Sequence, residues 1–222
     1  MKHIYRFIYR KIKLINLKRD YDEILKYLKE KNIKILNEKQ FYNYWNKHKK
    51  IKEPIFILRH DVDRSIKNIK IIEEIEKKHG VKSTLHIRVK NKSYKLKNIK
   101  KIKWKNFDIA LHIEFDNLND AKNDKNALEK LTHRKIIGSS IHGGGNYHIS
   151  KRKCLNILEN LGIKYIVNFN YDFFPKKENN ILLIPCKISD IDSLTKNKFI
   201  ENIDMVIKKG GCSSINIHPE YL

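Results

Sequence analysis

Short apolar runs alternate with amphipathic segments along most of the chain from Pro54 onward. Apolar runs of about four to eight residues are typical of buried strands, whereas apolar residues three and four apart indicate helices. The runs that predict strands are 55–60, 83–88, 107–113, 136–142, 165–168, 181–184 and 214–218, and helical periodicity covers 66–79, 118–132, 151–161 and 196–208. Repeated strand–helix units favour a parallel sheet, open or closed into a barrel. We therefore expect an α/β domain over residues 51–222.

The first fifty residues have a different pattern and predict a basic helical segment ahead of that domain. Helical periodicity covers 20–32 and 40–48, with a short apolar piece at 33–36. Residues 1–19 interleave Ile, Leu and Phe with Lys and Arg. Such a basic amphipathic stretch fits peripheral contact with an anionic membrane, although it more often packs on its own domain.

Basic residues are in large excess, with 48 Lys and Arg against 25 Asp and Glu and a formal net charge of +23. A basic surface attracts polyanions. Here, however, Lys is spread over every predicted helix, and no aromatic–basic recognition motif accompanies it, so we expect no specific nucleic-acid binding. Cys154, Cys186 and Cys212 are far apart in the sequence, which suits a reducing compartment. No apolar run reaches the roughly 18 residues of a membrane span, and a cytoplasmic protein is predicted.

An apolar strand ends in two carboxylates, Asp61 and Asp63, within the segment Arg-His-Asp-Val-Asp at 59–63. Side chains alternate across a strand, so both carboxylates should share a face with Arg59. Two acids on one face repel each other unless a cation joins them, which indicates a metal site. A simpler alternative is an acidic N-cap for the following helix. Asp-x-Asp after a strand is also found in glycosyltransferases and in haloacid-dehalogenase-like phosphatases.

Histidines stand at the ends of three later predicted strands, at His112, His142 and His218. The carboxyl ends of strands are where α/β barrels and open sheets place their sites, so these residues should converge with the two aspartates. Imidazole and carboxylate together suit Zn²⁺ or a similar divalent ion. His142 leads into three glycines, which permit close backbone approach to a ligand. His218 is suited to general acid work.

These motifs resemble those of the polysaccharide deacetylases with a NodB-like domain, of carbohydrate esterase family 4 type. The branch they resemble has a first motif that reads Arg-His-Asp-Val-Asp. The resemblance covers most of the chain from about residue 20, and it rests on 58–65, the continuation 75–84, Leu111-His112-x-Glu114, His142-Gly143 and Ile217-His218-Pro219. It implies a distorted (β/α) barrel of about seven strands. It also implies a metal-dependent hydrolase that removes an acyl group, such as acetyl, from an amino sugar or glycan in surface-polysaccharide metabolism.

The same resemblance assigns roles to individual residues. Asp61 would be the general base, Asp63 a metal ligand and His218 the general acid. His112 and His142 complete the expected metal set, with zinc as the expected ion. The expected substrate-binding residues are Arg59, Glu114, Gly143 and Tyr147.

The chain departs from the family pattern at two places. The family's second motif has two metal-binding histidines four residues apart, but Asp116 stands four residues after His112. The family's Arg-x-Pro-Tyr motif is absent as well. The third ligand is therefore open among Glu114, Asp116 and His142. A catalytically inactive barrel that binds a glycan or a partner protein is the alternative function.

Overall fold

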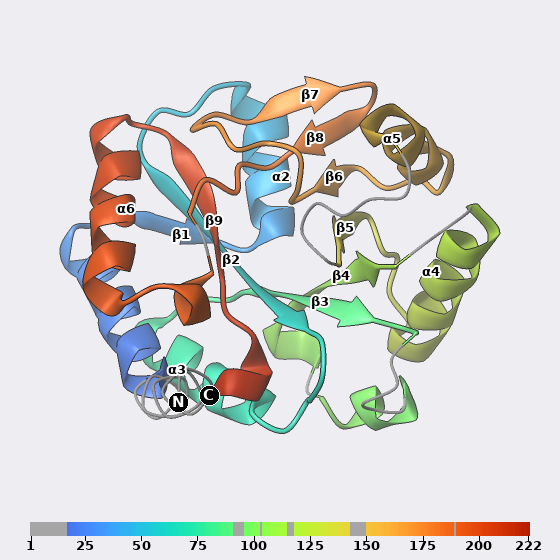
Figure 1. Ribbon diagram of the computed structural model, residues 1–222, viewed down its shortest axis with the longest axis horizontal. Helices are drawn as coiled ribbons and strands as arrows, with labels where there is room; N and C mark the ends of the chain where they lie inside the picture. The colour runs from blue at the N-terminus through green and yellow to red at the C-terminus, as the bar shows by residue number, and fades with distance from the viewer. Residues whose placement is uncertain (1–16, 91–95, 103, 115–117, 143–149, 189) are drawn as a thin grey trace, which may run out of the picture.

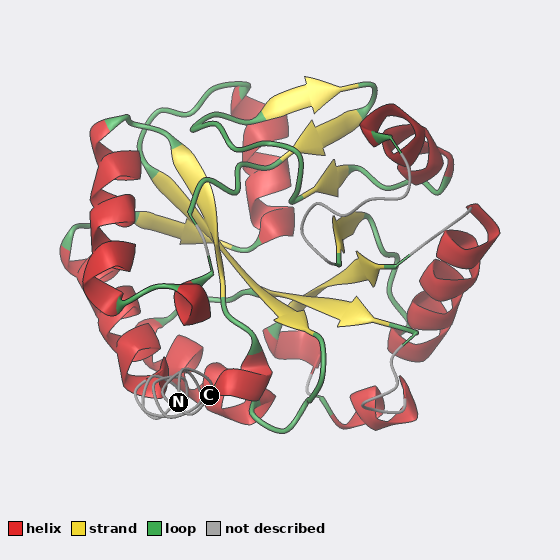
Figure 2. Cartoon of the chain, viewed as in Figure 1, coloured by secondary structure: helices red, strands yellow, loops and turns green. Residues whose placement is uncertain are grey.

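A curved, mostly parallel sheet forms the centre of the molecule, and helices surround it (Figures 1 and 2). The computed structural model describes residues 17–90, 96–102, 104–114, 118–142, 150–188 and 190–222. The strands are β1 (Lys34–Leu36), β2 (Ile55–Val62), β3 (Thr84–Arg88), β4 (Asp108–Ile113), β5 (Gly138–Ile141), β6 (Tyr165–Ile166), β7 (Lys176–Glu178), β8 (Ile181–Leu183) and β9 (Cys212–Asn216). Their order is β1-β2-β3-β4-β5-β6-β8-β7, with β9 paired to β2.

Every strand pair is parallel except β7 and β8, which form an antiparallel hairpin. Parallel neighbours need a crossover, and helices supply most of the crossovers here. The helices cover 17–30, α2 (Glu38–His48), α3 (Ile69–His79), α4 (Leu118–Thr132), α5 (Lys151–Asn160) and α6 (Lys196–Lys208). The expected α/β architecture is thereby confirmed, with element positions close to those that the apolar pattern predicts.

The sheet curves toward a barrel without a continuous ladder to close it among the described residues. One edge of β9 pairs with β2. Its other edge donates two backbone hydrogen bonds, from Cys212 to the carbonyl of Phe173 at 2.8 Å and from Ser214 to the carbonyl of Pro185 at 2.7 Å. Both acceptors lie in irregular segments beside the β7–β8 hairpin. These bonds satisfy the edge of β9 where no regular strand faces it.

Residues 17–48 share the sheet and the core of the rest of the chain. The helix over 17–30 buries Leu17, Tyr21, Ile24, Leu25 and Leu28 at 2% exposure or less, in one cluster with residues of the barrel. Fully burying an apolar side chain of this size stabilises a fold by about 1.5–3 kcal/mol. The segment is also not wholly helical, because the apolar piece at 33–36 forms β1 beside β2.

The strand ends differ from the predicted ones in both directions, since β2 continues two residues past its predicted end at residue 60. β5, β6 and β8 stop before the predicted ends of their apolar runs, and β9 begins at Cys212 and ends at Asn216, two residues before His218. The residues that follow these ends are mixed: His142 follows β5, whereas the buried Val167, Ile184 and Ile217 follow β6, β8 and β9. Among the described helices, none is both long and apolar enough to cross a membrane.

Candidate metal centre

The end of β2 presents an ion pair on the inner face of the sheet. Arg59 Nη1 donates to both carboxylate oxygens of Asp61, at 2.8 and 3.0 Å. Asn216 of β9 adds two bonds at 3.1 Å, since its amide donates to Asp61 Oδ2 and its carbonyl accepts from the Asp61 backbone N–H. Burial would raise the pKa of Asp61, but the charge of Arg59, together with those of His112, His86 and His218, outweighs it and holds that pKa well below its usual range. Asp61 is therefore a fixed, ionised carboxylate.

His60 lies on the opposite face of the same strand, as the side-chain alternation requires. Its ring contacts the Ile217 carbonyl at 3.0 Å and Glu76 Oε1 at 2.7 Å. Glu76 also accepts from Tyr21 and Ser83, so a closed polar network ties α3 and the first described helix to β2. His60 therefore does not contact the aspartates, because its partners Ile217, Glu76 and Tyr21 are on the other side of the sheet.

Asp63, His112 and His142 converge at the carboxyl ends of β2, β4 and β5, with His112 as the penultimate residue of β4. Asp63 Oδ1 lies 3.2 Å from His112 Nε2 and 3.2 Å from His142 Nδ1. The two ring nitrogens are themselves 3.2 Å apart. Burial would raise the pKa of Asp63, but hydrogen bonds with His112 and His142 hold it well below its usual range.

This triangle of donor atoms has the dimensions of a tetrahedral zinc site. Ligand bonds of about 2.0–2.1 Å at tetrahedral angles place neighbouring ligand atoms about 3.3 Å apart. The three observed separations of 3.2 Å match that edge length. One carboxylate and two imidazoles are also a typical catalytic zinc set, which leaves a fourth position for water or substrate. The residues present thus fit a divalent cation.

Each histidine of the triangle has a polar partner on its other ring nitrogen. His112 Nδ1 is 2.7 Å from Ser140 Oγ, and His142 Nε2 is 3.6 Å from Glu114 Oε1. Such contacts orient metal-binding histidines and fix their tautomers. Glu114 itself lies outside the triangle and is paired with Arg88. Of the two candidates for the third ligand that the structure describes, His142 belongs to the triangle, whereas Glu114 contacts only the outer ring nitrogen of His142.

A second group that could hold a cation consists of Asp61, His86 and His112. Its atoms are already engaged: Asp61 accepts from Arg59 and Asn216, and His86 contacts Glu38 at 2.6 Å and Ser140 at 2.5 Å. A cation there would also lie beside the Arg59 guanidinium. The Asp63 group is therefore the better metal site.

His218 completes the group, since its Nε2 lies 3.6 Å from Asp63 Oδ2 and its side chain is 15% exposed. Arg59 is 8% exposed and directs its guanidinium at Asp61. In this geometry Arg59 holds the Asp61 carboxylate, and its expected contact with substrate stays a prediction. Three further residues named from the sequence lie outside the described part of the chain: Asp116, Gly143 and Tyr147.

Sequence reasoning missed Asn216, Glu38, His86 and Ser140, all buried beside the site. A signal for two of them exists in the strand register, which pairs His86 with Asp61 and Ser140 with His112. Neighbouring strands in register point such paired side chains to the same face. The register is a property of the folded sheet, so it became visible only in the structure.

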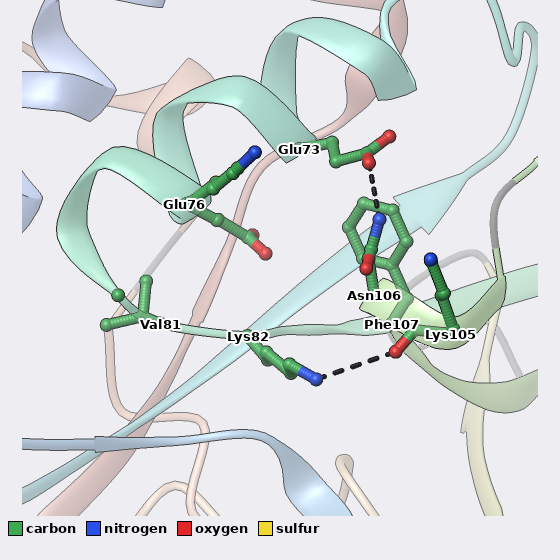
Figure 3. Close-up of a pocket in the computed structure, with 9 residues that line it drawn as sticks. Glu73, Glu76, Val81, Lys82, Lys105, Asn106 and Phe107 are labelled. Atoms are coloured by element: carbon green, nitrogen blue, oxygen red, sulfur yellow. Dashed lines mark hydrogen bonds between the residues drawn. The ribbon is translucent and has the colours of Figure 1, made fainter.

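A pocket of about 460 Å³ lies away from these residues, at the end of α3 and ahead of β3 and β4 (Figure 3). Asn106 donates to Glu73 there, and Lys82 Nζ donates to the Lys105 carbonyl at 3.5 Å. The pocket is thus at the amino ends of the strands, opposite the edge where α/β folds place their chemistry.

No family model matches the chain, and no curated protein matches it. Solved structures do resemble it. The deacetylase PplD of Streptococcus pyogenes, in complex with acetate, superposes with a TM-score of 0.63 at 17% identity and 86% coverage of each chain. IcaB from Ammonifex degensii has a TM-score of 0.62 at 10% identity, covering 85% of this chain and 88% of that one.

A polysaccharide deacetylase from Bacillus cereus has a TM-score of 0.57 at 16% identity, covering 86% of this chain and 61% of that chain. A mutant of a CE4 family pseudoenzyme with restored enzymatic activity has a TM-score of 0.50 at 15% identity, covering 77% and 58%. At these identities the likeness concerns the fold. The chain therefore has the NodB-like fold of the polysaccharide deacetylases.

Proposed function

We propose that this protein is a metal-dependent hydrolase that removes an acetyl group from an amino sugar or glycan. The observation that carries the proposal is the 3.2 Å triangle of Asp63, His112 and His142, whose spacing suits a tetrahedral Zn²⁺ site. The shared fold supports the reaction class, and the acetate bound to the streptococcal neighbour is what removal of an acetyl group releases.

The divalent ion, when bound, would polarise an acyl carbonyl and lower the pKa of a water. Asp61 lies on the inner face beside this site and is ionised, so it can accept the proton of the attacking water. Arg59 and Asn216 hold that carboxylate in one orientation. His218, on the other side of Asp63, is placed to return a proton to the departing amine or alcohol.

A barrel that binds a glycan without catalysis is the second candidate. Two observations favour it. The charges of Arg59 and of three nearby histidines hold the pKa of Asp61 so low that the carboxylate is a weak proton acceptor, and one of the similar structures derives from a pseudoenzyme. A sequence difference adds to them, because Asp116 stands where the family's second metal-binding histidine would be.

Metal analysis and acetate release from N- and O-acetylated oligosaccharides distinguish the two. We expect one zinc per chain and acetate release that stops on chelation. Asp63→Ala should lose metal and activity together, whereas His218→Ala should keep the metal and lose at least about 100-fold in turnover, as is typical for a general acid. Acetate release from a fully chelated sample would contradict the proposal. Bound zinc and glycan without any release would favour the second candidate.

A further inference from the structure

Four buried side chains form one continuous chain of polar contacts that ends at His112. Glu38 Oε1 lies 2.6 Å from His86 Nε2, and His86 Nδ1 lies 2.5 Å from Ser140 Oγ. Ser140 Oγ then lies 2.7 Å from His112 Nδ1. The first three residues are 0% exposed and His112 is 3% exposed. The chain runs from α2 through β3 and β5 to β4, so it joins the N-terminal part of the molecule to the candidate metal centre (Figure 1).

The number of protons available decides the direction of these bonds once a cation occupies the site. A histidine that binds metal through Nε2 must carry its proton on Nδ1. His112 then donates to Ser140, and the single hydroxyl proton of Ser140 must go to His86 Nδ1. His86 in turn carries its proton on Nε2 and donates to Glu38. The series needs a pure acceptor at its end, and an ionised carboxylate is one.

We propose that Glu38, His86 and Ser140 are positioning residues that hold His112 with its proton on Nδ1 and the lone pair of Nε2 directed at the cation. This inference rests on the proposed metal-dependent function. The three residues touch neither substrate nor cation. They act through the orientation and tautomer of one ligand, and their buried negative end stabilises the positive charge that coordination places on that imidazole.

The local structure prepares Glu38 for this task. Glu38 is the first residue of α2, where the helix dipole favours a carboxylate. Asn37 and Gln40 cap that helix reciprocally, and the Glu38 backbone N–H donates to Thr84 Oγ1 at 3.1 Å. Burial raises the pKa of Glu38, and the charges of His86 and Arg59 oppose that rise. The backbone of Glu38 is thus fixed to β3 independently of its side chain.

The strand register supplies the rest of the alignment. His112 is directly opposite Ser140 in the β4–β5 pair, and His86 is opposite Ala110, two residues before His112 on the same face. The small Ala110 leaves the inner face open between the two imidazoles, whose rings meet edge to face at 6.3 Å. Ser140 fits between them as the bridge.

Two measurements on the full-length protein test the inference. The first is the tautomer of each imidazole in the zinc-loaded wild type, from long-range ¹H–¹⁵N NMR spectra. We expect the proton on Nδ1 of His112 and on Nε2 of His86. A proton on Nδ1 of His86 would overturn the inference, and this measurement needs no variant.

The second is the zinc dissociation constant from competition with a chromophoric chelator. Ser140→Ala removes the bridge and should weaken zinc binding about 10- to 100-fold, the usual effect of losing a partner of a ligating histidine. Ser139→Ala is the matched control, because Ser139 is equally buried on β5 and its hydroxyl has no hydrogen-bond partner among the described residues. That control should bind zinc as the wild type does.

The outcomes separate the inference from the function on which it rests. A wild type that binds no zinc overturns both. If the wild type binds zinc and Ser140→Ala binds it with equal affinity, the positioning role of Glu38, His86 and Ser140 is overturned, while the proposed hydrolase is unaffected. A loss of zinc affinity in Ser140→Ala but not in Ser139→Ala, together with the predicted tautomers, supports that positioning role.

Discussion

Removing the charge of Asp61 should destabilise the fold, because Arg59 would remain buried without its carboxylate. The side chains of Asp61 and Arg59 are only 8% and 10% exposed, in that order. Arg59 Nη1 lies 2.8 and 3.0 Å from the two carboxylate oxygens of Asp61. Removing one partner of a buried ion pair typically costs about 3–5 kcal/mol. Asp190 also interacts with the guanidinium and offsets part of this loss. We therefore expect Asp61→Asn to lower the free energy of unfolding by about 3 kcal/mol.

Urea unfolding of a double-mutant cycle checks this value. Arg59→Met combined with Asp61→Asn leaves no unpaired charge at the pair, so the double variant should be no less stable than Asp61→Asn alone. Asp172→Asn is the control, since Asp172 and Lys176 form a contact of 2.9 Å with side chains 50% and 56% exposed. It should leave the unfolding midpoint unchanged. If the costs of Asp61→Asn and Arg59→Met sum to the cost of the double variant within about 0.5 kcal/mol, the two side chains are not coupled and the reasoning is refuted.

Three further predictions concern zinc affinity, the stability of the protein at low pH and the packing of the sheet. His142→Ala should abolish tight zinc binding, measured by chelator competition, whereas Glu114→Ala should weaken it about 10-fold or more as an outer partner; equal losses would contradict the assignment. Because the folded pKa of Asp61 is lowered, its contribution to stability is present above about pH 4 and is lost as the pH falls further. The stability gap between wild type and Asp61→Asn should therefore narrow in urea titrations from pH 5 to lower pH. Gly138→Ala should cost about 1–3 kcal/mol, because its Cβ would lie 2.1 Å from the buried Tyr165 ring; an unchanged thermal midpoint would refute that.

The regular part of the fold could be predicted because apolar periodicity marks it strongly. The apolar run 55–60 predicts most of β2, and the helix around Ile69, Ile72 and Ile75 shows its buried face at helical spacing. The pattern was weaker where short elements depend on tertiary contacts. β1 has three residues and exists because β2 offers it an edge, and β7 is polar and forms only as a hairpin partner of β8.

The candidate site was predictable to the extent that it stands at strand ends. Asp63, His112 and His142 are each the polar residue at or just beyond the end of an apolar run, and the structure brings them together. Glu38 and His86 carry no such mark. Glu38 reads as an ordinary acidic residue at a helix start, and His86 lies in the middle of an apolar strand. Only the register and the position of α2 show that both belong to the site.

The most direct test of the account is a crystal structure of the zinc-loaded protein with the ion located by its anomalous signal. We predict a single ion bound by Asp63 Oδ1, His112 Nε2 and His142 Nδ1 at about 2.0–2.2 Å. Zinc held by Asp61 and His86, or a protein that takes up no zinc while these three side chains stay in place, would contradict it.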